Sequence, residues 1–487
     1  YTRPWVRAHA TKDYLDMAQK VAEYEDVHVT FNLTPSLIRQ LNDLATGAKD
    51  IYWVLAEKPV SELTDQEKQF ILERFFDVNW QNIVSRYPRY QELLDKRGGG
   101  DEESVRAAME SFTDQDFLDL QVWFNLAWFD PVFLSEEPLL SLVEKGQNFS
   151  QEDKTILFEQ IVEILQRVIP YHAELQETGQ IEVTTTPYAH PILPLIYDNQ
   201  LALVGNPSAE MPENPFSYPQ DAEKHLELSV GMYQENFGRD VRGLWPGEGS
   251  VAQEIVPLVA EAGYSYMQTG EPVLAKSLGI DSFTRDSTGL VQQPDELYRP
   301  YYVSDAEGNQ VAVFFRDGSL SDYIGFDYSG MAGEAAAQDL IDHLEDIKIA
   351  LQDSGAEGPH VVSIILDGEN AWEYYENDGN EFFHALYSKF AESEMLKTVT
   401  PSEYLEMFPE QRSLDDLFPG AWFSPNYDTW IGEGEEAVAW DYLAKVRDDL
   451  SAYETGEASA SEEALAEAFD FMYLAEGSDW FWWYGAD

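Results

Sequence analysis

The sequence predicts an α/β fold built on parallel strands, and three observations support this. Short runs rich in β-branched and aromatic residues alternate with helical stretches up to about residue 405. Several of these runs end in polar or charged residues, as the strands of a parallel barrel do where they face an active site. One run, at 361–366, is almost wholly apolar, which is typical of a strand buried in a parallel sheet.

The strands are expected in the following order. The first, at 27–32, is followed by Pro35 and a helix from Ser36, and the second, at 181–186, ends at Pro187. A short run at 243–246 follows a charged helical stretch. The remaining predicted strands lie at 264–268, 311–315 and 361–366.

Two regions are predicted to be helical. Residues 50–175 resemble a helical insertion between two barrel strands, with a capped helix start at 64–67 and a glycine linker at 98–100. The region after about 410 is also helical, notably at 461–475. We therefore expect a barrel domain over residues 1–405, and the start of a truncated C-terminal helical domain over residues 406–487.

Composition excludes several classes of protein. Ninety acidic residues against 30 basic ones give a net charge of −60, which argues against nucleic-acid binding and against anionic membrane surfaces. No apolar run is long enough for a transmembrane helix. Without cysteine, a disulfide framework, a thiolate nucleophile and a Cys-ligated metal are all excluded.

The acidic excess is spread along the chain rather than gathered in a tail, which favours a protein of a high-salt medium. Such a surface repels itself in dilute buffer, and molar salt shortens the Debye length to roughly 3 Å and screens the repulsion. The alternative is an ordinary acidic protein. A salt-filled cytoplasm is the expected location, although secretion into brine would explain the charge equally.

The first candidate catalytic group is a carboxylate between two glycines. Glu248 lies in the segment GLWPGEGS at 243–250, directly after a predicted strand. Glycine permits close approach of a ligand, and Trp245 suits stacking on a sugar face. The competing interpretation is a helix start at which the dipole favours Glu248. The segment alone leaves both open.

The second candidate is Asp367, which follows the most apolar strand of the chain in the segment LDGENAWE at 366–373. Partial burial at that strand end would raise its pKa, as a general acid requires. An Asp-Gly turn into a helix is the equally common alternative.

Other candidates for substrate binding also follow strands. His190 lies between prolines, and Arg316 with Asp317 and Asp322 could brace a catalytic carboxylate. A structural histidine and a buried ion pair are the competing interpretations. The late aromatic residues, among them Trp430, are usually core but here lie among Asp, Gly and Ser, so sugar stacking is a rival role.

Several catalytic motifs are absent. We find no phosphate-binding loop, no HExxH zinc pair and no GxSxG nucleophile elbow. The eight histidines are scattered without the spacing of metal ligands.

Taken together, the motifs resemble glycoside hydrolase family 57, in its amylopullulanase and α-amylase-like branch. Four of the family's five signature regions are matched, at 179–191, 243–250, 366–372 and 400–405. Further similarity lies at 5–14, 30–37, 428–433 and 477–483, so that it extends over nearly the whole chain.

The resemblance implies a fold, a reaction and roles for residues. The fold is a distorted seven-stranded (β/α) barrel followed by a helical domain. The reaction retains the anomeric configuration of an α-glucan through a covalent intermediate, with Glu248 as nucleophile and Asp367 as general acid/base. It requires no metal and no organic cofactor. The residues expected to hold sugar hydroxyls or brace the carboxylates are His190, Arg316 and Asp322, and those expected to stack on sugar rings are Trp245, Trp372 and Trp430.

One departure from the family pattern leaves alternatives open. The first region, a His-Gln-Pro motif, is absent and is expected upstream of Tyr1. The Gly-Glu-Asn that follows Asp367 favours the hydrolase branch. A 4-α-glucanotransferase or branching enzyme is the nearest rival, and a non-catalytic glucan binder is another. Linkage preference and oligomeric state stay open.

Overall fold

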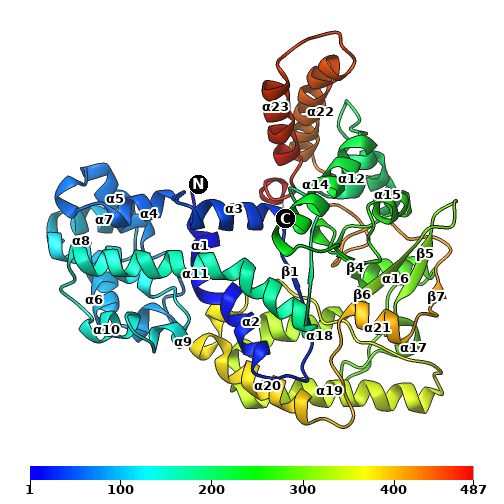
Figure 1. Cartoon of the computed structure of the whole chain (residues 1–487), viewed down its shortest axis with the longest axis horizontal. Coiled ribbons are helices and arrows are strands. Elements are labelled where there is room, and N and C mark those ends of the chain that lie inside the picture. The colour runs from blue at the N-terminus through cyan, green and yellow to red at the C-terminus, as the bar shows by residue number, and fades with distance from the viewer. Residues whose placement is uncertain (486–487) are drawn as a thin grey trace.

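The computed structural model describes residues 1–485 and consists mainly of helices around a curved parallel sheet (Figure 1). The strands are β1 (Val29–Asn32), β2 (Ile181–Thr184), β3 (Gly243–Leu244), β4 (Tyr266–Gly270), β5 (Tyr301–Ser304), β6 (Gln310–Arg316) and β7 (Arg412–Ser413).

The parallel strands follow one another in sequence order around the sheet. β1 pairs with β2, and β3 pairs with β4, which pairs with β6. Single bridges join these pieces: Thr185 pairs with Leu244, and Arg316 pairs with Ser363 of the segment 361–366. β5 runs antiparallel to β6 and carries β7 on its outer edge. This order confirms the predicted parallel α/β fold.

The segment 361–366 differs from its prediction. It is not a regular strand, and its residues are only half-buried rather than buried on both faces. Its sheet contact is the bridge from Ser363 to Arg316, and within residues 1–485 no strand pairs with its other edge. Its side chains pack in two directions, with Val361 against one hydrophobic cluster and Val362, Ile364 and Leu366 against the main core.

A small aromatic cluster packs on one face of the sheet. Tyr266, Phe314 and Tyr404 are buried there, with the half-buried Val361 and Val399 packed against them. Tyr266 and Phe314 meet edge to face, with ring centroids 5.6 Å apart. Residues from β4, from β6, from the segment 361–366 and from the helix at Pro401–Met407 thus share one cluster.

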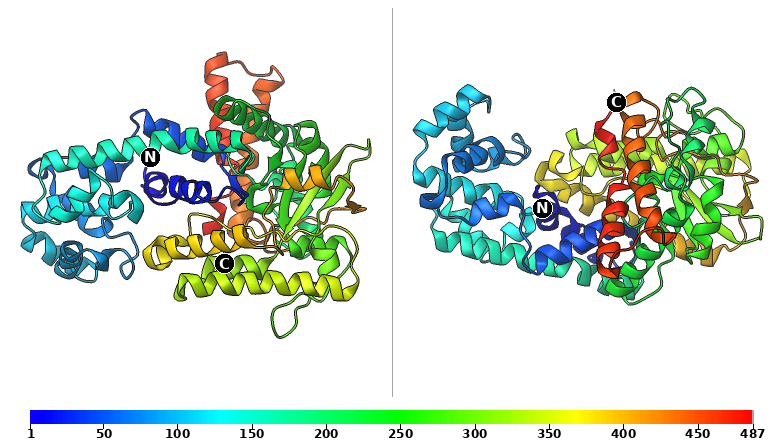
Figure 2. Two further views of the ribbon diagram at one scale, coloured as in Figure 1. Left: turned by 60° about the horizontal axis from the view of Figure 1, so that its bottom comes forward. Right: turned by 90° about the horizontal axis from the view of Figure 1, so that it is seen from above.

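The helical stretch predicted at 50–175 forms a lobe at the left of Figure 1. Its helices are α4 (Ile51–Glu57), α5 (Asp65–Arg74), α6 (Pro88–Arg97), α7 (Glu102–Ser111), α8 (Asp114–Leu126), α9 (Pro131–Leu134), α10 (Leu139–Lys145) and α11 (Gln151–Thr178). The predicted cap is present: Thr64 and Glu67 form a reciprocal capping box at the start of α5. The long helix α11 runs from this lobe to the sheet (Figures 1 and 2).

The remaining helices surround the sheet or follow it. Those before and between the strands are α1 (Trp5–His9), α2 (Leu15–Ala22), α3 (Pro35–Ala45), α12 (Leu193–Asp198), α13 (Ala202–Gly205), α14 (Pro219–Phe237), α15 (Val256–Glu261), α16 (Glu271–Ser277), α17 (Pro294–Leu297), α18 (Gly318–Asp322) and α19 (Gly333–Ser354). Those after residue 370 are α20 (Asn380–Glu392), α21 (Pro401–Met407), α22 (Gly434–Glu454) and α23 (Glu462–Ala475). No helix among residues 1–485 is both long enough and apolar enough to cross a membrane.

Candidate active site

The predicted site residues lie beyond the carboxyl ends of neighbouring parallel strands. His190 follows β2, Glu248 follows β3, Arg316 ends β6 and Asp367 follows the segment 361–366. Because parallel strands present their carboxyl ends at the same edge, the fold brings together side chains that are far apart in the sequence.

Glu248 lies in a single turn of 3-10 helix, Gly247–Gly249, with a left-handed backbone (φ 54°). A Cβ atom at Gly247 would lie 2.4 Å from the carbonyl oxygen of Pro191, so this position admits only glycine at the observed spacing. The backbone carbonyl of Glu248 accepts a hydrogen bond from Trp422 N at 3.0 Å. The loop is therefore held between the segment after β2 and the segment around Trp422.

Burial raises the pKa of the Glu248 carboxyl, and the charges of Asp367 and Asp479 raise it further. The charge of His190 opposes these effects and lowers it. The buried indole N–H of Trp422, which has no hydrogen-bond partner among the described residues, lies near enough to the carboxylate to lower its pKa as well. Glu248 and Asp367 are therefore close enough for the charge of Asp367 to change the pKa of Glu248.

Asp367 is reached by solvent, yet most of its surroundings are protein, and this burial raises the pKa of its carboxyl. His190 and Arg316 contribute positive charge that lowers it, as does a long hydrogen bond of 3.5 Å from Asn370 Nδ2. A carboxyl that keeps its proton more readily than usual suits a general acid.

Arg316 connects the end of β6 to the Asp367 segment. Its Nε donates to the carbonyl of Ile365 at 2.6 Å, and its Nη2 donates to Asp322 Oδ1 at 2.5 Å. The guanidinium also lies over the ring of Trp422, 4.7 Å from the centroid. The structure thus brings Arg316 and Asp322 together beside Asp367.

His190 has a left-handed backbone (φ 58°) and contacts a segment that follows α23. Its Nδ1 lies 2.9 Å from Ser478 Oγ and 3.5 Å from Asp479 Oδ1. Because its charge acts on both Glu248 and Asp367, the imidazole lies near both carboxylates.

The three predicted stacking residues are all buried. Trp245 packs edge to face against Trp422, with centroids 5.3 Å apart, in the wall behind Glu248. Trp372 is 4% exposed and packs on Phe383 at 4.2 Å, and Trp430 is 1% exposed. Both of these rings pack in the core, and Trp245 is 9% exposed, so the sugar-stacking role of the three stays a prediction.

Two residues at the site, Ser478 and Asp479, were not among the predicted site residues, whereas Trp422 belongs to the late aromatic residues for which sugar stacking was considered. The signal that could have suggested Ser478 and Asp479 is their place in a Gly-Ser-Asp run between a helix and an aromatic cluster. Their approach to His190 requires the C-terminal helices to fold back onto the sheet, which no local pattern reveals.

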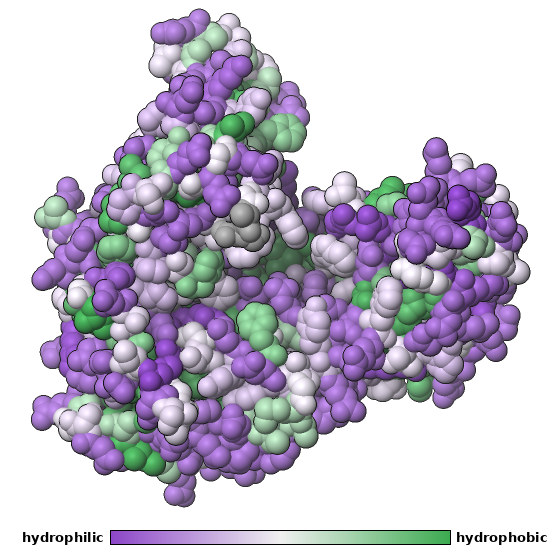
Figure 3. Space-filling view, turned by 180° about the vertical axis from the view of Figure 1, so that it is seen from behind, coloured by the Kyte–Doolittle hydropathy of each residue, from purple (hydrophilic) through white to green (hydrophobic). Residues whose placement is uncertain are grey.

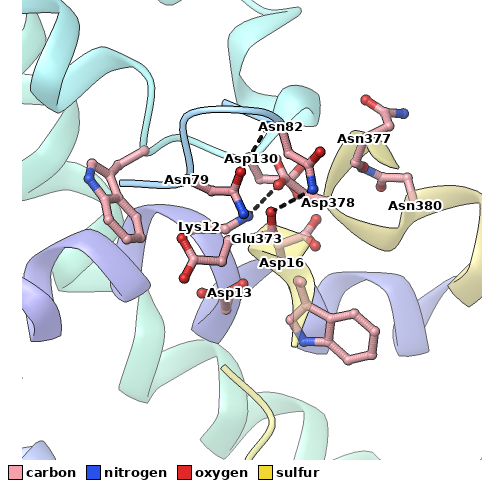
Figure 4. A network of polar contacts seen from close by, with 12 residues as sticks. Lys12, Asp13, Asp16, Asn79, Asn82, Asp130, Glu373, Asn377, Asp378 and Asn380 are labelled. Carbon is pink, nitrogen blue, oxygen red and sulfur yellow. Dashed lines mark hydrogen bonds and ion pairs between the residues drawn. The ribbon is translucent and has the colours of Figure 1, made fainter. Parts of the chain in front are cut away.

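A buried ionic network adjoins the site (Figure 4). Lys12, on a turn of π-helix at Ala10–Tyr14, pairs with Asp378, and Arg86 pairs with the same carboxylate at 3.3 Å. The neighbouring His9 binds Asp13 at 2.6 Å. Burial raises the pKa of Glu369, and the charge of Asp367 raises it further. A chain of charged groups therefore leads from Asp367 towards the helical lobe.

The surface is hollowed between the helical lobe and the rest of the molecule (Figure 3). A separate cavity of about 920 Å³, lined by residues of α9, α19 and α20, contains none of the four residues at the strand ends. The candidate active site is therefore the group of side chains at the strand ends, and this cavity is not part of it. In the described part of the chain, no three His, Asp or Glu side chains are arranged to hold a metal ion.

Known proteins resemble this chain in sequence and in fold. A family model described as glycosyl hydrolase family 57 matches residues 1–415. A 4-alpha-glucanotransferase of Thermococcus litoralis is 27% identical over 243 residues, which cover 48% of this chain. The match spans only 28% of that relative's length.

Two solved structures have similar folds over nearly the whole chain. The α-amylase AmyC from Thermotoga maritima has a TM-score of 0.57 at 15% identity, with coverage of 99% of this chain and 83% of that one. A GH57-type branching enzyme from Pyrococcus horikoshii has a TM-score of 0.60 at 15% identity, with coverage of 98% and 80%. At this identity the likeness concerns the fold, and it confirms the distorted (β/α)7 barrel.

Proposed function

The chain belongs to glycosyl hydrolase family 57, and from that premise we propose that it is a retaining glycosidase that acts on α-glucans. The observation that carries the proposal is that Glu248, after β3, and Asp367, after the segment 361–366, lie at the same edge of the sheet, where the charge of Asp367 acts on Glu248 and one imidazole acts on both carboxylates. Retaining glycosidases need two carboxyl groups about 5–5.5 Å apart on either side of the scissile bond.

The proposed reaction proceeds in two steps. In the first, the ionised Glu248 attacks the anomeric carbon, the glycosidic bond breaks, and Asp367 gives its proton to the leaving oxygen. In the second, Asp367 takes a proton from water, the water oxygen attacks the anomeric carbon, and Glu248 is released.

The charges of the two groups support this cycle. Burial raises the pKa of Asp367 and so favours its protonated form, and in the proposed cycle the negative charge of an ionised Glu248 favours that form further. Once Glu248 is esterified its charge is lost, the pKa of Asp367 falls, and Asp367 becomes a base. His190, Arg316 and Asp322 are proposed to hold sugar hydroxyls or brace the carboxylates, and Trp245 to shape the wall behind Glu248.

Transfer to a second glucan is the other candidate. The same covalent intermediate can be released by a sugar hydroxyl instead of water, and the similarity to a 4-alpha-glucanotransferase over 243 residues favours this possibility. Hydrolysis within the amylopullulanase and α-amylase-like branch remains our proposal. Hydrolysis results if water gives its proton to Asp367 in the second step, and transfer results if a sugar hydroxyl does so.

The test is to incubate the protein with soluble starch and with pullulan in molar KCl, beside its Glu248→Gln and Asp367→Asn variants. We expect reducing ends to appear with the wild type. The Asp367→Asn variant should lose on the order of 10²–10⁴ in kcat, because general acid–base catalysis contributes that much. It should be affected less on an aryl glucoside whose leaving group needs no proton. Glu248→Gln should lose at least as much on both substrates.

Product analysis separates the candidates. New reducing ends indicate hydrolysis, and redistribution of chain lengths without them indicates transfer. Near-normal activity of either variant, with correct folding shown by circular dichroism, would overturn the assignment of the two carboxylates. Binding of maltooligosaccharides without any product would overturn the proposal that the protein is an enzyme.

A further inference from the structure

The hairpin of α22 and α23 reaches the candidate site through the residues that follow it. The two helices pack against each other beside α14 (Figure 1). Directly after α23, residues 476–479 run alongside residues 188–190, which lead from β2 to the site. Two segments of the chain thus meet at His190.

Hydrogen bonds and close packing join the two segments. Ser478 N donates to the carbonyl of His190 at 3.0 Å, and Ser478 Oγ lies 2.9 Å from the imidazole Nδ1. A Cβ atom at Gly477 would lie 2.6 Å from the carbonyl oxygen of Ala189, so only glycine allows this approach. The imidazole of His190 is therefore oriented by a residue of the C-terminal segment.

His225, on α14, holds the first of these segments from behind. It is fully buried, and its backbone carbonyl accepts a hydrogen bond from Tyr188 N at 3.1 Å. Its Nδ1 accepts from Ala189 N at 3.4 Å. Because Nδ1 accepts, the ring proton lies on Nε2. Burial lowers the pKa of His225 to about 3, which keeps the ring neutral.

Glu476 holds the second segment and is the partner of His225. His225 Nε2 donates to Glu476 Oε2 at 2.8 Å, and both side chains are fully buried. Burial raises the pKa of Glu476 well above its usual range, and the charge of Asp221 raises it further. A protonated Glu476 explains why Oε1 faces no donor in the described part of the chain: it carries a proton directed at Asp221.

A second contact, made by Asp221 with Arg447, also anchors the hairpin to α14. Arg447 of α22 makes a bidentate ion pair with Asp221 of α14, at 2.5 and 2.9 Å, and also binds Glu454 at 2.8 Å. This ion pair ties α22 to α14 through atoms other than those that join His225 to Glu476. The contact between His225 and Glu476 fixes where the residues after α23 lie, rather than whether the hairpin docks.

We infer that His225 and Glu476 are a positioning pair: by joining the segment at 188–190 to the segment at 476–479, they set the orientation of the His190 imidazole through Ser478. The C-terminal hairpin is then part of the catalytic centre, although neither member of the pair reaches substrate. The catalytic consequence rests on the proposed function, whereas the orientation of His190 does not.

The test compares two substitutions of Glu476 and one of Ser478. Glu476→Gln keeps an acceptor for His225 and offers an N–H to Asp221, so it mimics the protonated carboxyl. Glu476→Leu removes the acceptor at similar volume. Ser478→Ala removes the contact to the imidazole and leaves the pair intact. Glu454→Gln is the matched control, since it loosens the binding of Arg447 on the same hairpin without touching the pair.

The first readout is independent of activity. The ring nitrogens of the eight histidines are observed by NMR in protein with isotopically labelled histidine, and the His190 signals are assigned by their loss in His190→Asn. We expect Glu476→Leu and Ser478→Ala to shift the His190 signals, and Glu476→Gln and Glu454→Gln to leave them unchanged. Unshifted His190 signals in folded Glu476→Leu would overturn the inference. If that variant does not fold, unshifted signals in Ser478→Ala would overturn it.

The second readout is kinetic and applies to the active enzyme. Misplacement by about 1 Å can cost on the order of 10²-fold in rate, so we expect Glu476→Leu to lose kcat with little change in KM, and Glu476→Gln to restore it. Equal losses in Glu476→Gln and Glu476→Leu would contradict the pair's role. If the wild type has no glucan activity, the proposed function fails while the NMR comparison still decides the positioning role.

Discussion

Glu248 and His190 share an unusual backbone conformation at the centre of the site. Both have φ values in the left-handed region, 54° and 58°, which costs a residue other than glycine about 1–3 kcal/mol unless its surroundings hold it. Each is held by a backbone N–H at 3.0 Å, from Trp422 for Glu248 and from Ser478 for His190. Both donors come from the last 70 residues, so the end of the chain stabilises the conformations on which the site depends.

The charge of His190 predicts a shift in pH dependence. The proposed reaction needs Glu248 ionised and Asp367 protonated, so kcat/KM falls at low pH through Glu248 and at high pH through Asp367. His190 lowers the pKa of both. We therefore expect His190→Asn to raise both pKa values and to move both limbs of the kcat/KM profile to higher pH.

A substitution of opposite sign is the control for this prediction. Asp479 raises the pKa of Glu248, so Asp479→Asn should move the acid limb to lower pH. Profiles measured on one maltooligosaccharide decide the matter. Movement of the acid limb in the same direction in both variants would contradict the electrostatic account.

Sequence reasoning at this scale identified residues by their place after strands. Glu248, Asp367, His190 and Arg316 were predicted in this way, and the structure places them at neighbouring strand ends. It did not single out Ser478, because that residue reaches His190 only when the C-terminal helices fold back. Aromatic residues among Asp, Gly and Ser proved ambiguous, since such composition does not distinguish a buried ring from an exposed one.

The elements were predicted best where the pattern is local. The strands at β1, β2, β4 and β6 and the capping box of α5 follow from residue spacing and cap chemistry. The segment 361–366 was expected to be a fully buried strand, but whether such a run pairs as a regular strand depends on the neighbouring strands of the whole sheet, which its own residues do not reveal. The strands β5 and β7 were not predicted, because they pair outside the parallel series.

The ion pair between α22 and α14 yields a prediction about stability. Arg447 is fully buried and Asp221 is 1% exposed, so Arg447→Met leaves a buried carboxylate without its partner. Breaking such a pair from one side typically costs about 3–5 kcal/mol, since the remaining charge is neither solvated nor paired. We expect a clear fall in Tm in a thermal unfolding experiment. Lys445→Met, an exposed position on the same helix, is the control and should leave Tm nearly unchanged.

At the scale of the whole molecule, the net charge of −60 is the dominant property. Part of the acidic excess is used in structure, because carboxylates cap helices and pair with most of the buried cations described above. The other carboxylates lie on the surface and repel one another, and the salt concentration sets the distance over which this repulsion acts. We therefore propose that the fold is adapted to a high-salt medium, which concerns its solvent and leaves the reaction unspecified.

This proposal predicts that stability depends on salt. At about 0.1 M ionic strength the Debye length is roughly 10 Å, so neighbouring surface carboxylates repel one another, and at 1 M it is roughly 3 Å. We expect Tm to rise as KCl is increased from 0.1 M to 2 M.

Substituting glutamine for three exposed glutamates of α11, Glu159, Glu174 and Glu177, removes charge without removing bulk, so it should raise Tm at low salt and leave it unchanged at high salt. Because salt also strengthens apolar burial, the difference between variant and wild type isolates the charge effect. A wild-type Tm that is independent of KCl, or a variant whose advantage persists at 2 M, would contradict the proposal.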